Sequence, residues 1–235
     1  MTRSSQTALI AELEAELAGV RADNARLRLL LDAKGAPGEL RHRQRNTLSV
    51  LRTIVRASAE PAEDLETYVS HFEDRLDAIG RVQAAIDSAG AVDLAYFIAT
   101  ELLIYGAHEG QQARISGPTV HLLPAAAQPF ALALNELSIN AIEHGCLLQP
   151  SGRLTVTWHV ATEEADRAFF TFVWKEIGSS GLVTPSRRGF GTEVLTGMLG
   201  YELQAKTVLA FEPDGLRCTI RFPLLAQFGR VADPA

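Results

Sequence analysis

Apolar residues recur at steps of three and four along residues 1–34, the first of three helical stretches. The seam positions are Ile10, Leu13, Leu17, Val20, Asn24, Leu27 and Leu31. This spacing is typical of a coiled coil, and a buried Asn24 is satisfied best by its counterpart in a parallel second copy. The pattern predicts a coiled-coil dimer. A helix that packs on its own chain is the alternative.

Residues 35–90 carry two further helical patterns. One runs from Glu39 to about Ala59, and the next runs from Leu65 to near Gly90 after a proline-containing turn. Two helices joined by a short turn form an antiparallel hairpin, and two hairpins in a dimer form a four-helix bundle. We therefore expect residues 35–90 to be a dimerisation hairpin. His71 is expected to be an ordinary surface residue.

Beyond residue 90 the pattern changes to helices mixed with short strands. The expected helices cover residues 94–105, 130–145 and 191–199, and the expected strands cover 113–116, 119–122, 153–160, 168–174, 202–211 and 216–222. Such a pattern predicts a layer of helices on one sheet. The chain is therefore expected to be α+β, with a helical region followed by an α/β domain at residues 91–225 and a tail at 226–235.

Composition and charge narrow the class of protein. The chain has 235 residues, of which 47% are hydrophobic, and a net charge of −6 with no basic patch, which argues against nucleic-acid binding. No run of 18 apolar residues and no signal peptide is apparent, so a cytoplasmic protein without membrane insertion is expected. Cys146 and Cys218 lack metal-ligand spacing and are expected to be reduced thiols in or near the core.

The stretch from Phe130 to Gly145 combines an apolar face with an unusual polar stripe. Glu136, Asn140 and Glu143 stand at i, i+4 and i+7, so they share one face of the helix without any basic residue. A hydrated Mg²⁺ is one candidate partner, since it takes few protein oxygens alongside substrate phosphates. A solvated surface helix is the alternative.

A second polar cluster follows the strand that ends at Glu176. Gly178 allows a ligand to approach the backbone closely, and Gly189 and Gly191 precede a helix whose free N–H groups near Thr192 favour a phosphate. A simple glycine-rich turn is the alternative for this segment. A Walker loop is excluded because no lysine stands in a GxxxxGK[ST] run.

Four motifs together carry a family resemblance. His42 in HRQRN, the helix LALNELSINAIEHG, the strand end WKE and the segment RRGFG resemble the HWE class of bacterial histidine kinases, which have a GHKL (Bergerat-type) ATP-binding domain. The resemblance covers roughly residues 39–223. It implies that ATP phosphorylates His42 and that the phosphoryl group then passes to an aspartate in the receiver domain of a response regulator.

The resemblance also implies roles for individual residues. Glu136 would polarise the reacting site, Asn140 would hold Mg²⁺ and the phosphates, and Glu176 would bind the adenine amino group. His42 and Glu136 are thus the catalytic candidates and Asn140 the metal ligand. The full cofactor-binding set, beneath a lid at residues 177–188, is Asn140, Glu143, Glu176, Gly178, Arg188, Gly189, Phe190, Gly191 and Thr192.

Several positions depart from the family's pattern. Asn135 stands where a histidine usually precedes the glutamate, Glu143 and His144 replace a Lys-Tyr pair, and Arg45 replaces a lysine of the phosphoacceptor motif. Residues 177–180 take the place of a Gly-Gly-Pro. The residue after His42 is not an acid, so Glu39, one turn earlier, is the candidate base.

Three functions remain open from the sequence. The first is a soluble histidine kinase that receives its input through the coiled coil, from a separate sensor protein. The second is a phosphotransfer or scaffold protein that keeps His42 but has a degenerate ATP-binding domain. The third is an anti-sigma-type kinase, which NAIEHG also resembles, although the hairpin with His42 argues against it.

Overall fold

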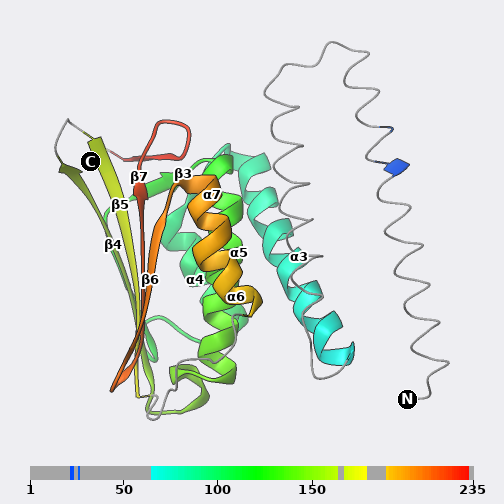
Figure 1. Cartoon of the computed structure of the whole chain (residues 1–235), viewed down its shortest axis with the longest axis vertical. Coiled ribbons are helices and arrows are strands. Elements are labelled where there is room, and N and C mark those ends of the chain that lie inside the picture. The colour runs from blue at the N-terminus through cyan, green and yellow to red at the C-terminus, as the bar shows by residue number, and fades with distance from the viewer. Residues whose placement is uncertain (1–21, 24–25, 27–64, 164–166, 179–188, 233–235) are drawn as a thin grey trace.

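The computed structural model describes residues 22–23, 26, 65–163, 167–178 and 189–232 (Figure 1). The expected coiled coil therefore lies outside the described residues, apart from Ala22, Asp23 and Arg26, which are helical and exposed. His42, the first helix of the hairpin and most of the lid also lie outside them.

A five-stranded sheet forms one side of the molecule. Its strands are β2 (Ala113–Ser116), β4 (Arg153–Glu163), β5 (Arg167–Ile177), β6 (Lys206–Glu212) and β7 (Gly215–Pro223), in the order β2-β4-β5-β7-β6. The β2 strand runs parallel to β4, and the other neighbours are antiparallel. The expected α+β class and the β4–β5 and β6–β7 hairpins are confirmed.

A second, three-stranded sheet closes one end of the fold. It consists of β1 (Val92–Asp93), β3 (Val120–Leu122) and β8 (Gly229–Val231), in the order β1-β3-β8. Strand β8 pairs antiparallel with β3 and lies within residues 226–235, where the sequence suggested a tail. A strand of three residues is too short to show a period-two pattern, which explains why the sequence did not reveal it.

The helices form two layers beside the large sheet (Figure 1). The layer next to the sheet contains α4 (Leu94–Ile104), α5 (Pro124–Glu143) and the continuous helical segment α6 (Phe190–Thr192), η3 (Glu193–Met198) and α7 (Leu199–Leu203). The outer helix α3 (Leu65–Ala89) packs along α5. A short 3₁₀ turn, η1 (Cys146–Leu148), follows α5.

The core forms where the inner face of the sheet meets α5. Alternate residues of β5 point inward, so Phe170, Phe172 and Trp174 are fully buried. Phe130 of α5 packs edge-to-face on Phe172, with ring centroids 5.0 Å apart. The same alternation carries on to Glu176, which directs this carboxylate toward the helices rather than toward solvent.

The outer helix α3 contributes to the same core. Ile79, Val82 and Ile86 are buried in one cluster with residues of α4, α5 and the sheet. The boundary expected at residue 90 therefore separates two stretches of sequence whose apolar side chains pack together.

The largest differences from the expected boundaries are at the start of α5 and at the start of β6. Helix α5 begins at Pro124, six residues before the expected start, because Pro124 fits the first turn and Pro129 is accommodated inside the helix. The strand expected from residue 202 begins only at Lys206. Residues 202 and 203 instead end α7, and Gln204 adopts a left-handed conformation (φ 56°) that stops the helix.

Cys146 and Cys218 are free and buried, as expected. Burial raises the pKa of each thiol to about 12, so both stay protonated at neutral pH. In the described part of the chain, no helix is long and apolar enough to cross a membrane.

Candidate nucleotide site

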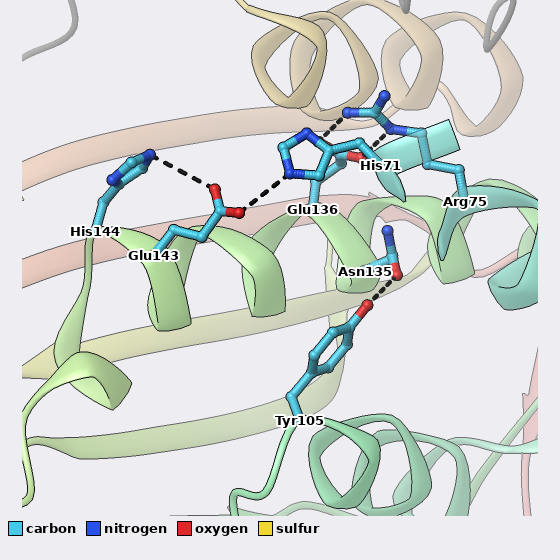
Figure 2. A network of polar contacts seen from close by, with 7 residues as sticks. All are labelled: His71, Arg75, Tyr105, Asn135, Glu136, Glu143 and His144. Carbon is cyan, nitrogen blue, oxygen red and sulfur yellow. Dashed lines mark hydrogen bonds and ion pairs between the residues drawn. The ribbon is translucent and has the colours of Figure 1, made fainter. Parts of the chain in front are cut away.

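The acidic stripe of α5 is met by basic side chains of α3. Arg75 donates from Nε to Glu136 Oε1 at 2.7 Å and from Nη2 to Glu136 Oε2 at 3.2 Å, which is a bidentate pair. One turn earlier on α3, His71 Nε2 lies 3.1 Å from Glu143 Oε1 (Figure 2). His71 lies at the surface with 27% of its side chain exposed, and it also contacts the acidic stripe, which the sequence did not indicate.

The Arg75–Glu136 pair is buried on both sides. The two side chains are 8% and 6% exposed. Burial raises the pKa of Glu136, and the Arg75 guanidinium opposes that rise. The Glu136 carboxyl group therefore lies in a poorly solvated environment beside one cation.

The segment that begins at Gly189 closes over the same stripe. Phe190 is buried, and the Arg75 guanidinium carbon lies 3.7 Å from its ring centroid. A Cβ added at Gly191 would lie 3.2 Å from Glu136 Oε2 and 3.3 Å from Asn140 Nδ2. Glycine is thus the residue that lets this backbone approach both polar side chains.

Backbone donors are available at the same place. Gly189 caps the helix without a side-chain hydrogen bond, and the first N–H groups of a helix have no partner within it. These donors, near Thr192, suit the phosphate groups that the sequence led us to expect there. The segment that contains Gly189 and Gly191 therefore places its backbone N–H groups near Glu136 and Asn140.

Asn140 suits a magnesium ligand by its chemistry and its setting. It is half-buried, and within the described ranges its side chain has no hydrogen-bond partner. No group of three or more His, Cys, Asp or Glu that could hold a metal occurs in those ranges either. Magnesium fits such a site because it keeps several waters and takes one or two protein oxygens.

Glu176 lies just beyond the C-terminal end of α5, beside Cys146, and is 1% exposed. Its Oε1 accepts from Trp174 Nε1 at 3.0 Å, and its Oε2 accepts from the Cys146 backbone N–H at 2.9 Å. A Cβ at Gly145 would lie 2.1 Å from Glu176 Oε2, so only glycine fits there. Each oxygen keeps a second lone pair for an amino group.

The strand end after Glu176 is anchored by a salt-bridge cluster that the sequence did not reveal. Lys175 Nζ lies 2.5 Å from Asp214 Oδ1 and 2.7 Å from Glu212 Oε2, while the Gly178 N–H donates to the Asp214 carbonyl. Hydrogen bonds from Lys175 lower the pKa of both carboxyls. This support for Gly178 is present at neutral pH and is lost as the pH falls through those pKa values.

Asn135, at the position before Glu136, belongs to a separate contact. Its Oδ1 accepts from Tyr105 Oη at 2.7 Å (Figure 2), whereas its buried Nδ2 has no partner among the described residues. Successive helix residues differ by about 100°, so Asn135 faces α4 while Glu136 faces α3. Asn135, which stands where the family's pattern has a histidine, therefore lies on a different side of α5 from the acidic stripe.

The structure thus brings together Glu136, Asn140, Glu143 and the segment Gly189–Thr192, and it places Glu176 and Gly178 beyond the end of α5. His42, Arg188, Glu39 and Arg45 lie outside the described residues. Sequence reasoning missed Arg75 and His71. Their spacing of four residues on a helix, opposite an acidic stripe, is the signal that was available.

Comparison with known proteins agrees with this geometry. Residues 39–119 match the family described as HWE histidine kinase. The blue-light-activated histidine kinase of Brucella anthropi is 29% identical over 192 residues, which cover 80% of this chain and 39% of that protein. That of Rhizobium johnstonii is 29% identical over 187 residues, 79% of this chain and 52% of that protein. The chain thus spans about half or less of these relatives.

Solved structures share the fold. A blue-light activated histidine kinase from Erythrobacter litoralis superposes with a TM-score of 0.54 at 15% identity, covering 77% of this chain and 60% of that one. Its histidine kinase domain gives a TM-score of 0.50 at 18% identity, covering 77% and 95%. The helical region followed by a mixed sheet is therefore the architecture of a histidine kinase catalytic region.

The fold is one that the solved histidine kinase structures share. Over residues 39–119 the chain is similar to the HWE histidine kinase family, and the curated relatives named above are histidine kinases. The resemblance based on the four sequence motifs is confirmed.

Proposed function

We propose that this protein is an autophosphorylating histidine kinase of a two-component system. ATP is the phosphoryl donor, His42 is the acceptor, and an aspartate in the receiver domain of a response regulator is the next acceptor. A ring nitrogen of His42 forms a bond to the γ-phosphorus as the bond from that phosphorus to the β–γ bridging oxygen breaks, which releases ADP. A base takes the proton from the imidazole.

The observation that carries the proposal is the approach of Gly191 to Glu136 and Asn140. It places backbone donors, a buried carboxylate and an amide that no described residue hydrogen-bonds around one small region. Phosphoryl transfer is mostly positioning and charge stabilisation, so such a set of groups is what the reaction requires.

Each group has a defined task in this proposal. Asn140 holds Mg²⁺, which neutralises phosphate charge when bound, and the N–H groups after Gly189 hold the phosphates. Glu136 polarises the reacting site, and Glu176 accepts from the adenine amino group beside Gly178. Glu143, Arg188, Phe190 and Thr192 complete the surroundings of the nucleotide.

The phosphoacceptor is tested by labelling. Purified protein given labelled ATP and Mg²⁺ is expected to gain an acid-labile, base-stable phosphate, and His42→Ala should lose it entirely. His108→Ala is the matched control, because His108 is exposed and distant from the acidic stripe in sequence. Label that survives in His42→Ala would rule out this acceptor.

The same experiment addresses the alternative function. A phosphotransfer or scaffold protein would accept phosphate on His42 from a phosphorylated receiver domain but would take none from Mg-ATP. Glu176 already accepts hydrogen bonds from two protein donors, so adenine has to bind to its remaining lone pairs. An ATP titration measures whether the nucleotide binds.

We also propose that residues 1–34 and the hairpin form a parallel homodimer. Asn24 satisfies its amide across the dimer axis only in a parallel register, so Asn24→Leu should stabilise the dimer while loosening its register or oligomer number. Removal of residues 1–34 should weaken association. Light scattering that finds a full-length monomer at tens of micromolar, roughly the range where short coiled coils associate, would contradict the dimer.

A further inference from the structure

Arg75 is the point at which three elements of the nucleotide site meet. It belongs to α3, it binds both oxygens of Glu136 on α5, and its guanidinium lies on the ring of Phe190 in α6 (Figure 2 shows the pair with Glu136). Only 6% of Arg75 is exposed. A long basic side chain buried to this degree is uncommon unless it is paired.

The pairing fixes the orientation of the Glu136 carboxylate. A flexible glutamate has several rotamers on a helix, whereas two parallel N–H···O bonds from a planar guanidinium hold the carboxylate in one plane. The same carboxylate faces the backbone of Gly191, since a Cβ there would lie 3.2 Å from Oε2. Arg75 therefore determines how Glu136 is presented to the segment that follows Gly189.

The stacking contact of Arg75 with Phe190 fixes the segment that follows Gly189. With the guanidinium carbon 3.7 Å from the ring centroid, Arg75 holds Phe190 in a buried position. Phe190 lies between Gly189 and Gly191, and neither glycine has a side chain that could anchor the segment. The placement of these backbone N–H groups thus depends on the Phe190 contact.

We infer that Arg75 is a positioning residue of the nucleotide site, which holds the Glu136 carboxylate and the segment Gly189–Thr192 in one fixed arrangement. This inference rests on the proposed function, because it assigns Arg75 to the same site. It also makes α3 a part of that site, although α3 belongs by sequence to the helical region before the α/β domain.

Arg81 provides a control that distinguishes a positioning role of Arg75 from a purely structural role of α3. It makes a comparable bidentate pair with Glu101 of α4, at 2.7 and 2.9 Å, yet it touches neither α5 nor the segment after Gly189 in the contacts of the described residues. If α3 served only as a support, conservative changes at Arg75 and at Arg81 would have similar consequences.

The first experiment compares Arg75→Lys with Arg81→Lys in full-length protein. Lysine keeps the charge but loses the planar fork and the stacking surface. Autophosphorylation turnover is expected to fall at least tenfold in Arg75→Lys and further in Arg75→Met, while the Kd for Mg-ATP rises by a smaller factor, because the adenine contacts of Glu176 and Gly178 are untouched. Arg81→Lys should keep wild-type turnover.

The second experiment does not depend on turnover. Amide hydrogen exchange of residues 190–198 is expected to accelerate at least tenfold in Arg75→Met, because Phe190 loses its partner. Amides of β5 and β7 should exchange as in the wild type, which excludes general unfolding. Arg75→Lys provides the measurement if Arg75→Met does not fold.

The two experiments separate the possible failures. Unchanged exchange at residues 190–198, equal loss of turnover in the two lysine variants, or higher turnover in Arg75→Lys would overturn the positioning role. If the wild-type protein takes no label from ATP, the proposed function fails, and the exchange comparison still decides whether Arg75 holds the segment.

Discussion

Asn140→Ala is expected to weaken the binding of Mg-ATP at least tenfold and to stop autophosphorylation. The side chain stands on the acidic face of α5, beside Gly191, and offers an amide oxygen that no described group uses. A tenfold loss corresponds to about 1.4 kcal/mol, which is within the range of one lost metal or phosphate contact. Asn140→Asp should weaken binding as well, since it adds a negative charge between Glu136 and Glu143.

Melting with and without nucleotide measures this effect. The free protein should melt as the wild type does, because Asn140 is half-buried and its side chain has no hydrogen bond to another described residue. The stabilisation by ligand, about 2.7 kcal/mol at a concentration 100 times the Kd, should shrink. Ser138→Ala is the matched control, since this buried hydroxyl two residues earlier also lacks a partner in the described part of the chain. Unaltered affinity and turnover in Asn140→Ala would favour the scaffold function.

Arg81→Leu is expected to lower the free energy of unfolding by about 2–4 kcal/mol. This is toward the lower end of the cost of breaking a buried ion pair, because Arg81 is partly exposed. Glu101 is fully buried, with 0% of its side chain exposed, and both its oxygens accept from Arg81. Removal of the arginine leaves a carboxylate without a partner in the core. The melting temperature should fall by about 5–15 °C for a chain of this size.

Two further variants test the cause. The double variant Arg81→Leu/Glu101→Leu should recover most of the loss, because the buried charge is removed along with its partner. Arg217→Leu should cost much less than Arg81→Leu, because both side chains of its pair with Glu212 are partly exposed. Wild-type melting of Arg81→Leu would show that Arg81 does not stabilise Glu101.

The sequence predicted best those features that depend on local patterns. Alternation along β4 and β5 indicated the central hairpin, and the same alternation placed Glu176 at a strand end, where it lies. Helical periodicity put Glu136, Asn140 and Glu143 on one face of α5. It also indicated α3 and α4 nearly to the residue.

Features that depend on long-range pairing were not predictable in the same way. Arg75 and Glu136 are 61 residues apart, and no periodic pattern says which of two amphipathic helices will pack on the other. Lys175 reads as a solvent-facing strand residue until Asp214 and Glu212 of the neighbouring hairpin are seen beside it. The cation expected opposite the acidic stripe turned out, in part, to be a guanidinium of the protein itself.

The packing of α3 also decides where this protein can be divided for expression or for the building of chimeras. A fragment that starts at residue 91 would lose the apolar side chains of α3 and both arginine partners, which leaves two buried carboxylates exposed to water or unpaired. A recombinant piece that keeps the nucleotide site intact has to include α3 from Leu65. A foreign input module is therefore best joined before this helix rather than at the apparent boundary near Gly90.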